Sequence, residues 1–193
     1  MRHNEVRDLE AEFLMDICKD IKIEPELLPV GNTILPGANV AEKARLDFSA
    51  VGVFGSLVRN FFDVRVSNLN SPAYKDKTPQ KVYEIQEREK KRDYNQRVIQ
   101  VEKGTFTPLI FSTTGGMGPE ATKYHKRVAQ LISKKKKEEY ADVLKHIRTR
   151  LRFSILRGVV IAIRGDRGRK KRRQSCPVSE LAYNLIPDSY ELH

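Results

Sequence analysis

The spacing of apolar residues in the first third of the chain predicts a helix, an edge strand and a β-hairpin. Residues 3–20 carry apolar side chains at intervals of three and four, as in an amphipathic helix. Residues 21–39 hold two short apolar runs broken by prolines, which indicates an edge strand or an irregular connection. Apolar and polar residues then alternate over 45–50 and 61–66, and the glycines between these two runs predict the turn of a hairpin.

Helices dominate the pattern in the second half of the chain. A Thr-Pro pair begins a helix over 79–102, and a strand starts at residue 105 and runs into a Gly-Gly turn. Apolar spacing predicts two further helices, over 119–136 and 138–163. The order is therefore helix, strand, hairpin, helix, strand and two helices, which predicts an α/β (α+β) layer fold.

Two acids fall on the strands of the predicted hairpin. If the turn centres on residues 55–56, Asp47 lies within about one residue of Asp63 across the ladder, so the two carboxylates share a small volume. Residues two apart in a strand point to the same face, so Asp63 also stands beside Arg65. A structural ion pair, Asp63 with Arg65 or Asp47 with Arg45, would explain the same residues without any chemistry.

The helix over 79–102 brings a lysine toward these acids. Its inward stripe includes Tyr83, Lys90 and Tyr94, whereas Lys91 lies about 100° away around the helix. We expect Lys90 on the packed face and Lys91 facing solvent or nucleic acid. Two carboxylates can hold Mg²⁺ or Mn²⁺, and a lysine beside them can orient water or neutralise charge on a phosphate.

The net charge of +11 is concentrated near the C-terminus. Residues 164–173, RGDRGRKKRR, hold seven bases and one acid. We therefore divide the chain into a domain, residues 1–163, and a basic tail, residues 164–193, which lacks periodicity and is expected to be disordered. Basic patches suit a polyanion such as DNA, with RNA as a further candidate, although solvated helix faces and a solubilising tail would look similar. The residues assigned to DNA binding are Arg65, Arg148, Arg150, Arg152, Arg169, Lys170, Lys171, Arg172 and Arg173.

Composition narrows the cellular setting. No apolar run approaches the roughly 18 residues needed to span a bilayer, and the charged N-terminal residues do not resemble a signal peptide. Cys18 and Cys176 are too few and too far apart for a disulfide framework or a zinc knuckle. We expect an intracellular, reduced protein without membrane contact, and residues 168–173, GRKKRR, favour the nucleus.

An acid on one strand followed by Asp-x-base on the next resembles the PD-(D/E)XK, restriction-endonuclease-like superfamily, whose core is αβββαβ. The fit is closest to the endonuclease domains of non-LTR retrotransposons, which carry their lysine on the following helix in a Lys-rich segment ending in Tyr. The segments that carry this resemblance are RHN (2–4), REKKRDYN (88–95), RVIQVEKGTFTPLIFSTTGGMGPEA (97–121) and RTRLRFSILRG (148–158). Arg65 departs from the family, since it stands where a lysine is usual.

The resemblance implies a restriction-endonuclease-like αβββαβ core with additional C-terminal helices, and a Mg²⁺- or Mn²⁺-dependent endonuclease that nicks target DNA. It makes Asp47 and Asp63 the metal ligands and Lys90 or Lys91 the catalytic lysine. Such a domain would be the tail of a longer protein, partnered by a reverse transcriptase.

Three other residues have side chains that could bind a metal ion: Glu10, His3 and His125. Glu10, on the inward edge of the first helix, is a further candidate metal ligand, with a surface glutamate as the alternative. His3 and His125 are expected on helix surfaces. A non-catalytic nucleic-acid-binding remnant of the same domain is the alternative function, and Arg65 favours it.

Overall fold

The computed structural model describes residues 2–31 and 33–168, with the backbone alone for Arg2 and residues 165–168. The described residues up to Val160 form one compact unit, and the described residues from Ile161 on are separate from it. The elements follow the expected order. They are α1 (Arg2–Met15), β1 (Lys19–Ile23), β2 (Phe48–Val51), β3 (Arg59–Ser67), the 3-10 turn Pro72–Tyr74, α2 (Pro79–Arg97), the π-helical turn Val98–Glu102, β4 (Thr105–Ser112), α3 (Pro119–Lys136) and α4 (Tyr140–Gly168).

The four strands form one mixed sheet in the order β1-β2-β3-β4. β1 pairs antiparallel with β2 and β2 antiparallel with β3, whereas β3 and β4 run parallel along their length. A parallel pair needs a crossover connection, and α2 supplies it between β3 and β4. The described part of the chain is therefore an α+β fold with four helices and a four-stranded mixed sheet.

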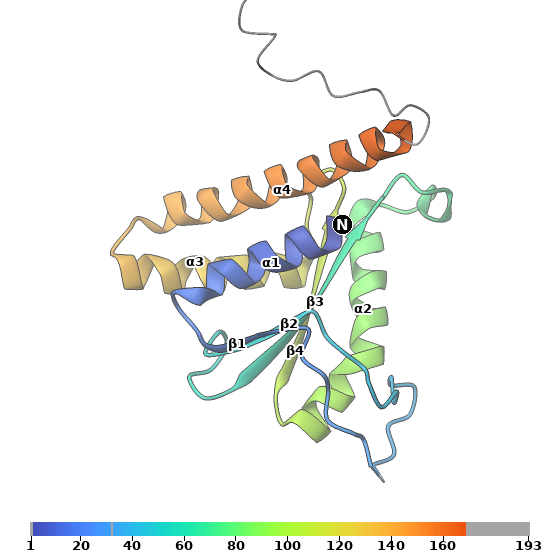
Figure 1. Cartoon of the computed structure of the whole chain (residues 1–193), viewed down its shortest axis with the longest axis vertical. Coiled ribbons are helices and arrows are strands. Elements are labelled where there is room, and N and C mark those ends of the chain that lie inside the picture. The colour runs from blue at the N-terminus through green and yellow to red at the C-terminus, as the bar shows by residue number, and fades with distance from the viewer. Residues whose placement is uncertain (1, 32, 169–193) are drawn as a thin grey trace, which may run out of the picture. The chain divides into compact units, whose positions relative to one another are not determined.

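Helices cover both faces of this sheet (Figure 1). α1, α3 and α4 lie on one face, where their apolar side chains share a core with Phe48 of β2, Phe62 of β3 and Phe111 of β4. α2 lies on the other face, where Val98 packs against Phe61 of β3. The alternation along β3 thus divides its side chains between two cores, and Asp63 is on the same side as Phe61.

A glycine allows β4 to begin close beside β3. A Cβ atom on Gly104 would lie 2.6 Å from the carbonyl oxygen of Arg59 and 3.0 Å from the ring of Phe61. The first contact is closer than a Cβ atom tolerates and the second is tight, so a larger residue here would push the two central strands apart at their start. The preceding residue, Lys103, ends the π-helical turn at a φ of 54°.

The structure corrects three expected boundaries. The first helix ends at Met15 rather than residue 20, because the chain turns there and Lys19–Ile23 pairs with β2. The first hairpin strand begins at Phe48, and Phe48 faces Phe62, so the register differs by one residue from the expected turn. The last helix extends to Gly168, five residues beyond the expected end, and therefore into the segment expected to be disordered.

A buried arginine fixes the long connection between β1 and β2. The Arg97 side chain is fully buried and donates to three main-chain oxygens, those of Asn39 (2.7 Å), Ala41 (2.9 Å) and Leu28 (2.9 Å). No helix or strand is formed by the described residues of this connection, 24–31 and 33–47, so their carbonyl groups need donors from elsewhere. Burial lowers the pKa of Arg97 below its ordinary value.

We expect Arg97→Ala to lower the free energy of unfolding by about 3 kcal/mol, because it leaves three buried carbonyl oxygens without a donor. Arg92→Ala is the matched control on the same helix, since the Arg92 side chain is 65% exposed and its polar contacts with described residues are to its neighbour Asp93. Its expected cost is below about 0.5 kcal/mol. Urea unfolding followed by circular dichroism measures both, and equal losses would show that the three contacts of Arg97 contribute nothing.

Candidate functional site

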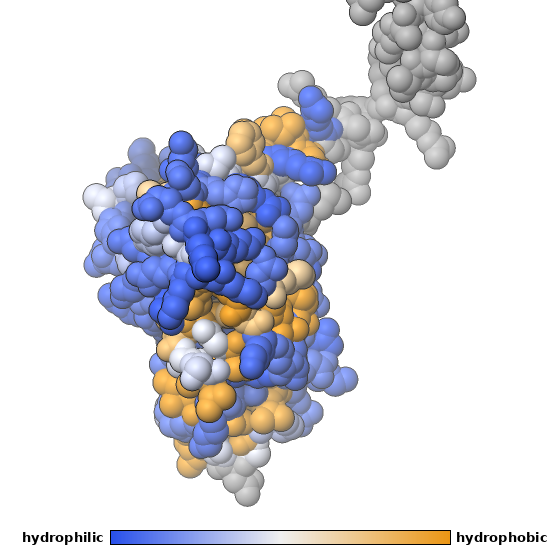
Figure 2. All heavy atoms as spheres, turned by 90° about the vertical axis from the view of Figure 1, so that its left-hand side faces the viewer, coloured by the Kyte–Doolittle hydropathy of each residue, from blue (hydrophilic) through white to orange (hydrophobic). Residues whose placement is uncertain are grey.

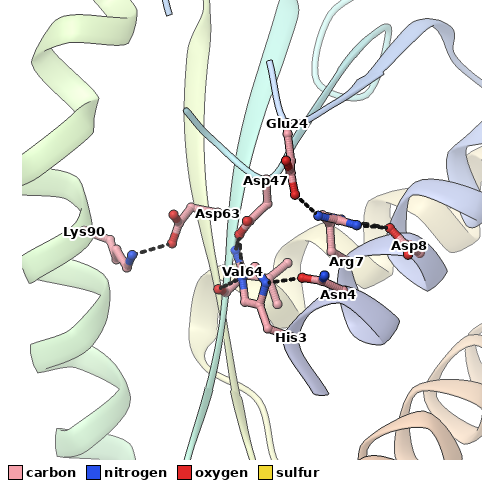
Figure 3. Close-up of polar contacts among 9 residues, drawn as sticks. All are labelled: His3, Asn4, Arg7, Asp8, Glu24, Asp47, Asp63, Val64 and Lys90. Atoms are coloured by element: carbon pink, nitrogen blue, oxygen red, sulfur yellow. Dashed lines mark hydrogen bonds and ion pairs between the residues drawn. The ribbon is translucent and has the colours of Figure 1, made fainter. Parts of the chain in front are cut away.

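Asp63 lies in the middle of the central strand and points toward α2. Its carboxylate is largely buried, and the ammonium group of Lys90 lies 2.8 Å from Asp63 Oδ2 (Figure 3). Lys90 is on the stripe of α2 that also carries the buried Tyr83 and Glu87, so the expected inward position of Lys90 is confirmed. Two features stabilise the N-terminus of α2: Pro79 lies in its first turn, and the Thr78 hydroxyl accepts a hydrogen bond from the N–H of Lys81.

The pKa of Asp63 is raised above its ordinary value, and burial is the main cause. Lys90 acts in the opposite direction and favours the charged carboxylate. The negative charge of Asp47 raises the pKa of Asp63 further. Asp47 therefore lies near enough to Asp63 for its charge to act on the buried carboxylate.

Asp47 immediately precedes β2. If the β2–β3 register is continued by one residue, Asp47 lies opposite Asp63. Its Oδ2 atom accepts a hydrogen bond from the backbone N–H of Val64, 2.5 Å away, and faces Nε2 of His3 at 3.0 Å. The carboxylate is thus held at the edge of β3, next to the residue that follows Asp63.

His3, in the first turn of α1, reaches the hairpin, which the sequence did not lead us to expect. Its Nε2 atom lies 3.0 Å from Asp47 Oδ2 and 3.0 Å from the main-chain oxygen of Val64. The hydrogen bond with Asp47 raises the pKa of His3 from 6.5 to about 9, against an opposing effect of burial. The only sequence signal was the RHN segment itself, because a lone histidine near a helix start carries no spacing to a partner in another element.

Each acid of the site therefore has one base of its own. Figure 3 shows Lys90 approaching Asp63 from α2 and His3 approaching Asp47 from α1. In the described structure the two acids and the two bases form a pair of internal ion pairs.

The ion pairs that were considered from the sequence are not formed. Arg65 pairs with Glu89 of α2 at 2.7 Å, and Arg45 pairs with Glu26. Asp63 pairs with Lys90 instead of Arg65.

Lys91 is partly exposed, as expected, but it also has a partner in α3. Its ammonium group lies 2.7 Å from Glu120 Oε1, in the first turn of α3. The backbone N–H of Glu120 donates to Glu87 Oε1 at 2.9 Å, and burial raises the pKa of Glu87. A Cβ atom on Gly118 would lie 2.4 Å from that oxygen, so a larger residue where α3 starts would displace the Glu87 carboxylate. Lys91 thus joins α2 to α3, because the N-terminus of α3 is packed against α2.

The structure does not bring Glu10 to the two aspartates. Glu10 is fully buried between α1 and α3, and its carboxylate contacts Nε2 of His125 at 2.9 Å. His3, which does contact Asp47, precedes Glu10 by about 10 Å along the helix axis. His125 is likewise fully buried, so its expected surface position is wrong: it supplies the polar partner that a buried glutamate needs.

Within residues 2–31 and 33–168, no three histidine, cysteine, aspartate or glutamate side chains converge in a way that could hold a metal ion. A cation at Asp47 and Asp63 would therefore depend on these two carboxylates, main-chain oxygen and water.

The arginines expected to bind DNA differ in their exposure and in whether they form an ion pair within the protein. Arg150 forms a two-bond pair with Glu12, at 2.8 and 3.0 Å, whereas Arg152 is exposed and Arg148 half-buried. Figure 2 shows a strongly hydrophilic upper part on the face that includes the turn between α3 and α4, where Lys134–Lys137 lie. Arg169, Lys170, Lys171, Arg172 and Arg173 lie outside the described residues.

Comparison with protein-family models, with curated proteins and with solved structures found no match to this chain. None of the helices that the structure describes has the length and the apolar run required to cross a membrane.

We expect the imidazole of His3 to titrate with a midpoint at about 9 in the wild-type protein and close to 6.5 in Asp47→Asn, because the contact with Asp47 is the largest cause of the shift. Since the folded-state pKa is raised, the stabilisation from this contact is complete below pH 6.5 and is lost as the pH rises through about 9. Proton NMR of the histidine ring, in buffer with a chelator, measures both midpoints. Titration of His3 near 6.5 in the wild-type protein would contradict the contact.

Proposed function

We propose that this protein is a metal-dependent DNA endonuclease domain, with a restriction-endonuclease-like αβββαβ core of the type found in non-LTR retrotransposon proteins. The observation that carries the proposal is that Asp47, directly before β2, lies near enough to Asp63 of β3 for its charge to raise the pKa of Asp63, while the ammonium group of Lys90 lies 2.8 Å from Asp63. A helix contributes the lysine and a hairpin contributes the acids, as the sequence resemblance implies.

The order of elements supports the fold assignment. α1, three antiparallel strands, the crossover helix α2 and the parallel strand β4 follow one another as in an αβββαβ core, and α3 and α4 are additional C-terminal helices. This topology is shared with proteins of other functions, so the function is argued from the site.

The donor set fits a hard divalent cation. Two carboxylates and the main-chain oxygen of Val64 lie at one end of the hairpin, and Mg²⁺ commonly uses one or two carboxylates and retains several waters. A shared cation would offset the negative charge of Asp47, which raises the pKa of Asp63. Mn²⁺ takes the same oxygen ligands.

When bound, such a cation would polarise the scissile phosphate and lower the pKa of a water molecule. The side chains of this protein would orient the site and stabilise the charge on the phosphate. Asp63 and Asp47 orient the site, and Lys90, 23% exposed, stands at its margin, where its charge can stabilise negative charge on the phosphate. Arg65 occupies the usual lysine position but is engaged by Glu89, which supports the assignment of the lysine role to Lys90.

The proposed partner is DNA, with RNA as an alternative, and the proposed location is the nucleus. The basic residues 164–173 support both, since they carry a dense positive charge. A reverse transcriptase elsewhere in a longer parent protein is the expected functional partner.

A non-catalytic nucleic-acid-binding remnant is the second candidate. The presence of arginine at position 65, together with the internal pairing of both acids by His3 and Lys90, favours it. A plasmid assay separates the two candidates.

We expect the wild-type protein to nick supercoiled plasmid in Mg²⁺ or Mn²⁺, and Lys90→Ala to slow nicking by about 10²-fold or more because it removes the charge beside the phosphate. Asp63→Asn is expected to abolish nicking. Agarose electrophoresis of the relaxed product measures the rates.

Lys91→Ala is the matched control, since it removes a lysine from the adjacent position of the same helix. The Lys91 side chain is 41% exposed in its ion pair with Glu120, and such pairs contribute little to stability. We therefore expect an almost unchanged rate of nicking. DNA binding without nicking by the wild-type protein would leave only the remnant; loss of nicking in Lys91→Ala but not in Lys90→Ala would contradict the assignment of Lys90.

The tail should dominate the salt dependence of DNA binding. Substitution of its five consecutive bases, residues 169–173, by serine should lower the slope of log affinity against log salt by about 4 units, because fewer counterions are released. Fluorescence anisotropy with duplex DNA measures the slope. The control is a variant with five exposed lysines of the domain changed to serine: Lys43, Lys75, Lys77, Lys81 and Lys126. An unchanged slope in the tail variant would show that the tail does not contact phosphate.

A further inference from the structure

The imidazole of His3 occupies the point where two oxygens of the candidate site converge. Its Nε2 atom is 3.0 Å from Asp47 Oδ2 and 3.0 Å from the main-chain oxygen of Val64 (Figure 3). A carbonyl oxygen can only accept a hydrogen bond, so Nε2 carries a hydrogen and donates it. A polar N–H group therefore fills the space that these two oxygens face.

The same two oxygens are ligands that a hard divalent cation prefers, and such a cation would lie about 2.0–2.6 Å from each of them. A cation that binds both oxygens and an N–H group that donates to both need the same space. The imidazole and the cation are thus alternatives at Asp47 Oδ2 and Val64.

The charges of the site lead to the same conclusion. Asp47 and Asp63 are already faced by His3 and Lys90, one base for each acid. A divalent cation would add two positive charges beside these bases, and like charges at such distances repel. Of the two bases, His3 is the freer to leave, because its side chain is 43% exposed whereas that of Lys90 is 23% exposed.

We infer that His3 is the gate residue of the proposed cation site: its imidazole and a divalent cation compete for Asp47 Oδ2 and the Val64 carbonyl oxygen, and the cation binds when the imidazole turns away. This inference rests on the proposed function, because it presupposes the cation site at Asp47 and Asp63. It assigns His3 a role in controlling occupancy, separate from the role of Lys90 beside the phosphate.

Mn²⁺ titration of the full chain, with free Mn²⁺ followed by electron paramagnetic resonance, tests the competition without any DNA. We expect His3→Ala to bind Mn²⁺ at least about tenfold more tightly than the wild-type protein, because a competing hydrogen bond to a charged group is removed. His3→Gln, which can still donate one hydrogen bond, should fall between them. His146→Ala controls for the loss of an imidazole, since His146 lies exposed on α4. Circular dichroism confirms that each variant is folded.

Equal or weaker Mn²⁺ binding by His3→Ala would overturn the inference, and weaker binding would make His3 a ligand instead. Asp47→Asn, combined with His3→Ala, should remove the tight site and so place the bound ion. If the wild-type protein and His3→Ala both bind Mn²⁺ equally well, and Asp47→Asn removes that binding, the gate fails while the proposed cation site stands. If no variant binds Mn²⁺, both the cation site and the gate fail.

Discussion

The buried carboxylate of Asp63 is the constraint around which the site is organised. It lies on the central strand β3, on the face covered by α2, where water is largely excluded. A charge in such a position needs a partner, because its burial without one would cost several kcal/mol. Lys90 supplies that partner, and this fixes how α2 is rotated against the sheet. The raised pKa of Asp63 shows that the compensation is incomplete.

The rest of the α2 face follows from that rotation. With Lys90 directed at β3, Glu87 one turn earlier is directed at the N-terminus of α3, where it accepts the backbone N–H of Glu120. Lys91 then reaches the side chain of the same Glu120. A helix N-terminus has unpaired N–H groups and favours a nearby negative charge, so Glu87 serves α3 as an external cap. One helix thus carries the candidate lysine and also holds the neighbouring helix in place.

The opposite face of the sheet uses its charges for packing. Glu10 and His125 pair with each other between α1 and α3, among the apolar side chains of that core. His3, two turns earlier on α1, extends beyond that core to Asp47. The same helix therefore contributes one polar residue to the core and one to the candidate site. Their separation along the axis explains why Glu10 has no part in the site.

The sequence alone was sufficient to predict the helices and strands, their order along the chain, and the proximity of the two acids of the hairpin. Local periodicity specifies a helix or a strand, and a short hairpin limits which residues can face each other, so Asp47 and Asp63 could be paired to within one residue. The four-residue step from Lys90 to Tyr94 also indicated which lysine points inward. Tertiary structure decided the partners. Contacts of His3 with Asp47, Glu10 with His125 and Arg97 with three distant carbonyl groups join residues 44 to 115 positions apart, and no local pattern records which distant residue a buried polar group will meet. Those pairings depend on how helices cross the sheet, because the free energy of burial depends on the whole assembled core.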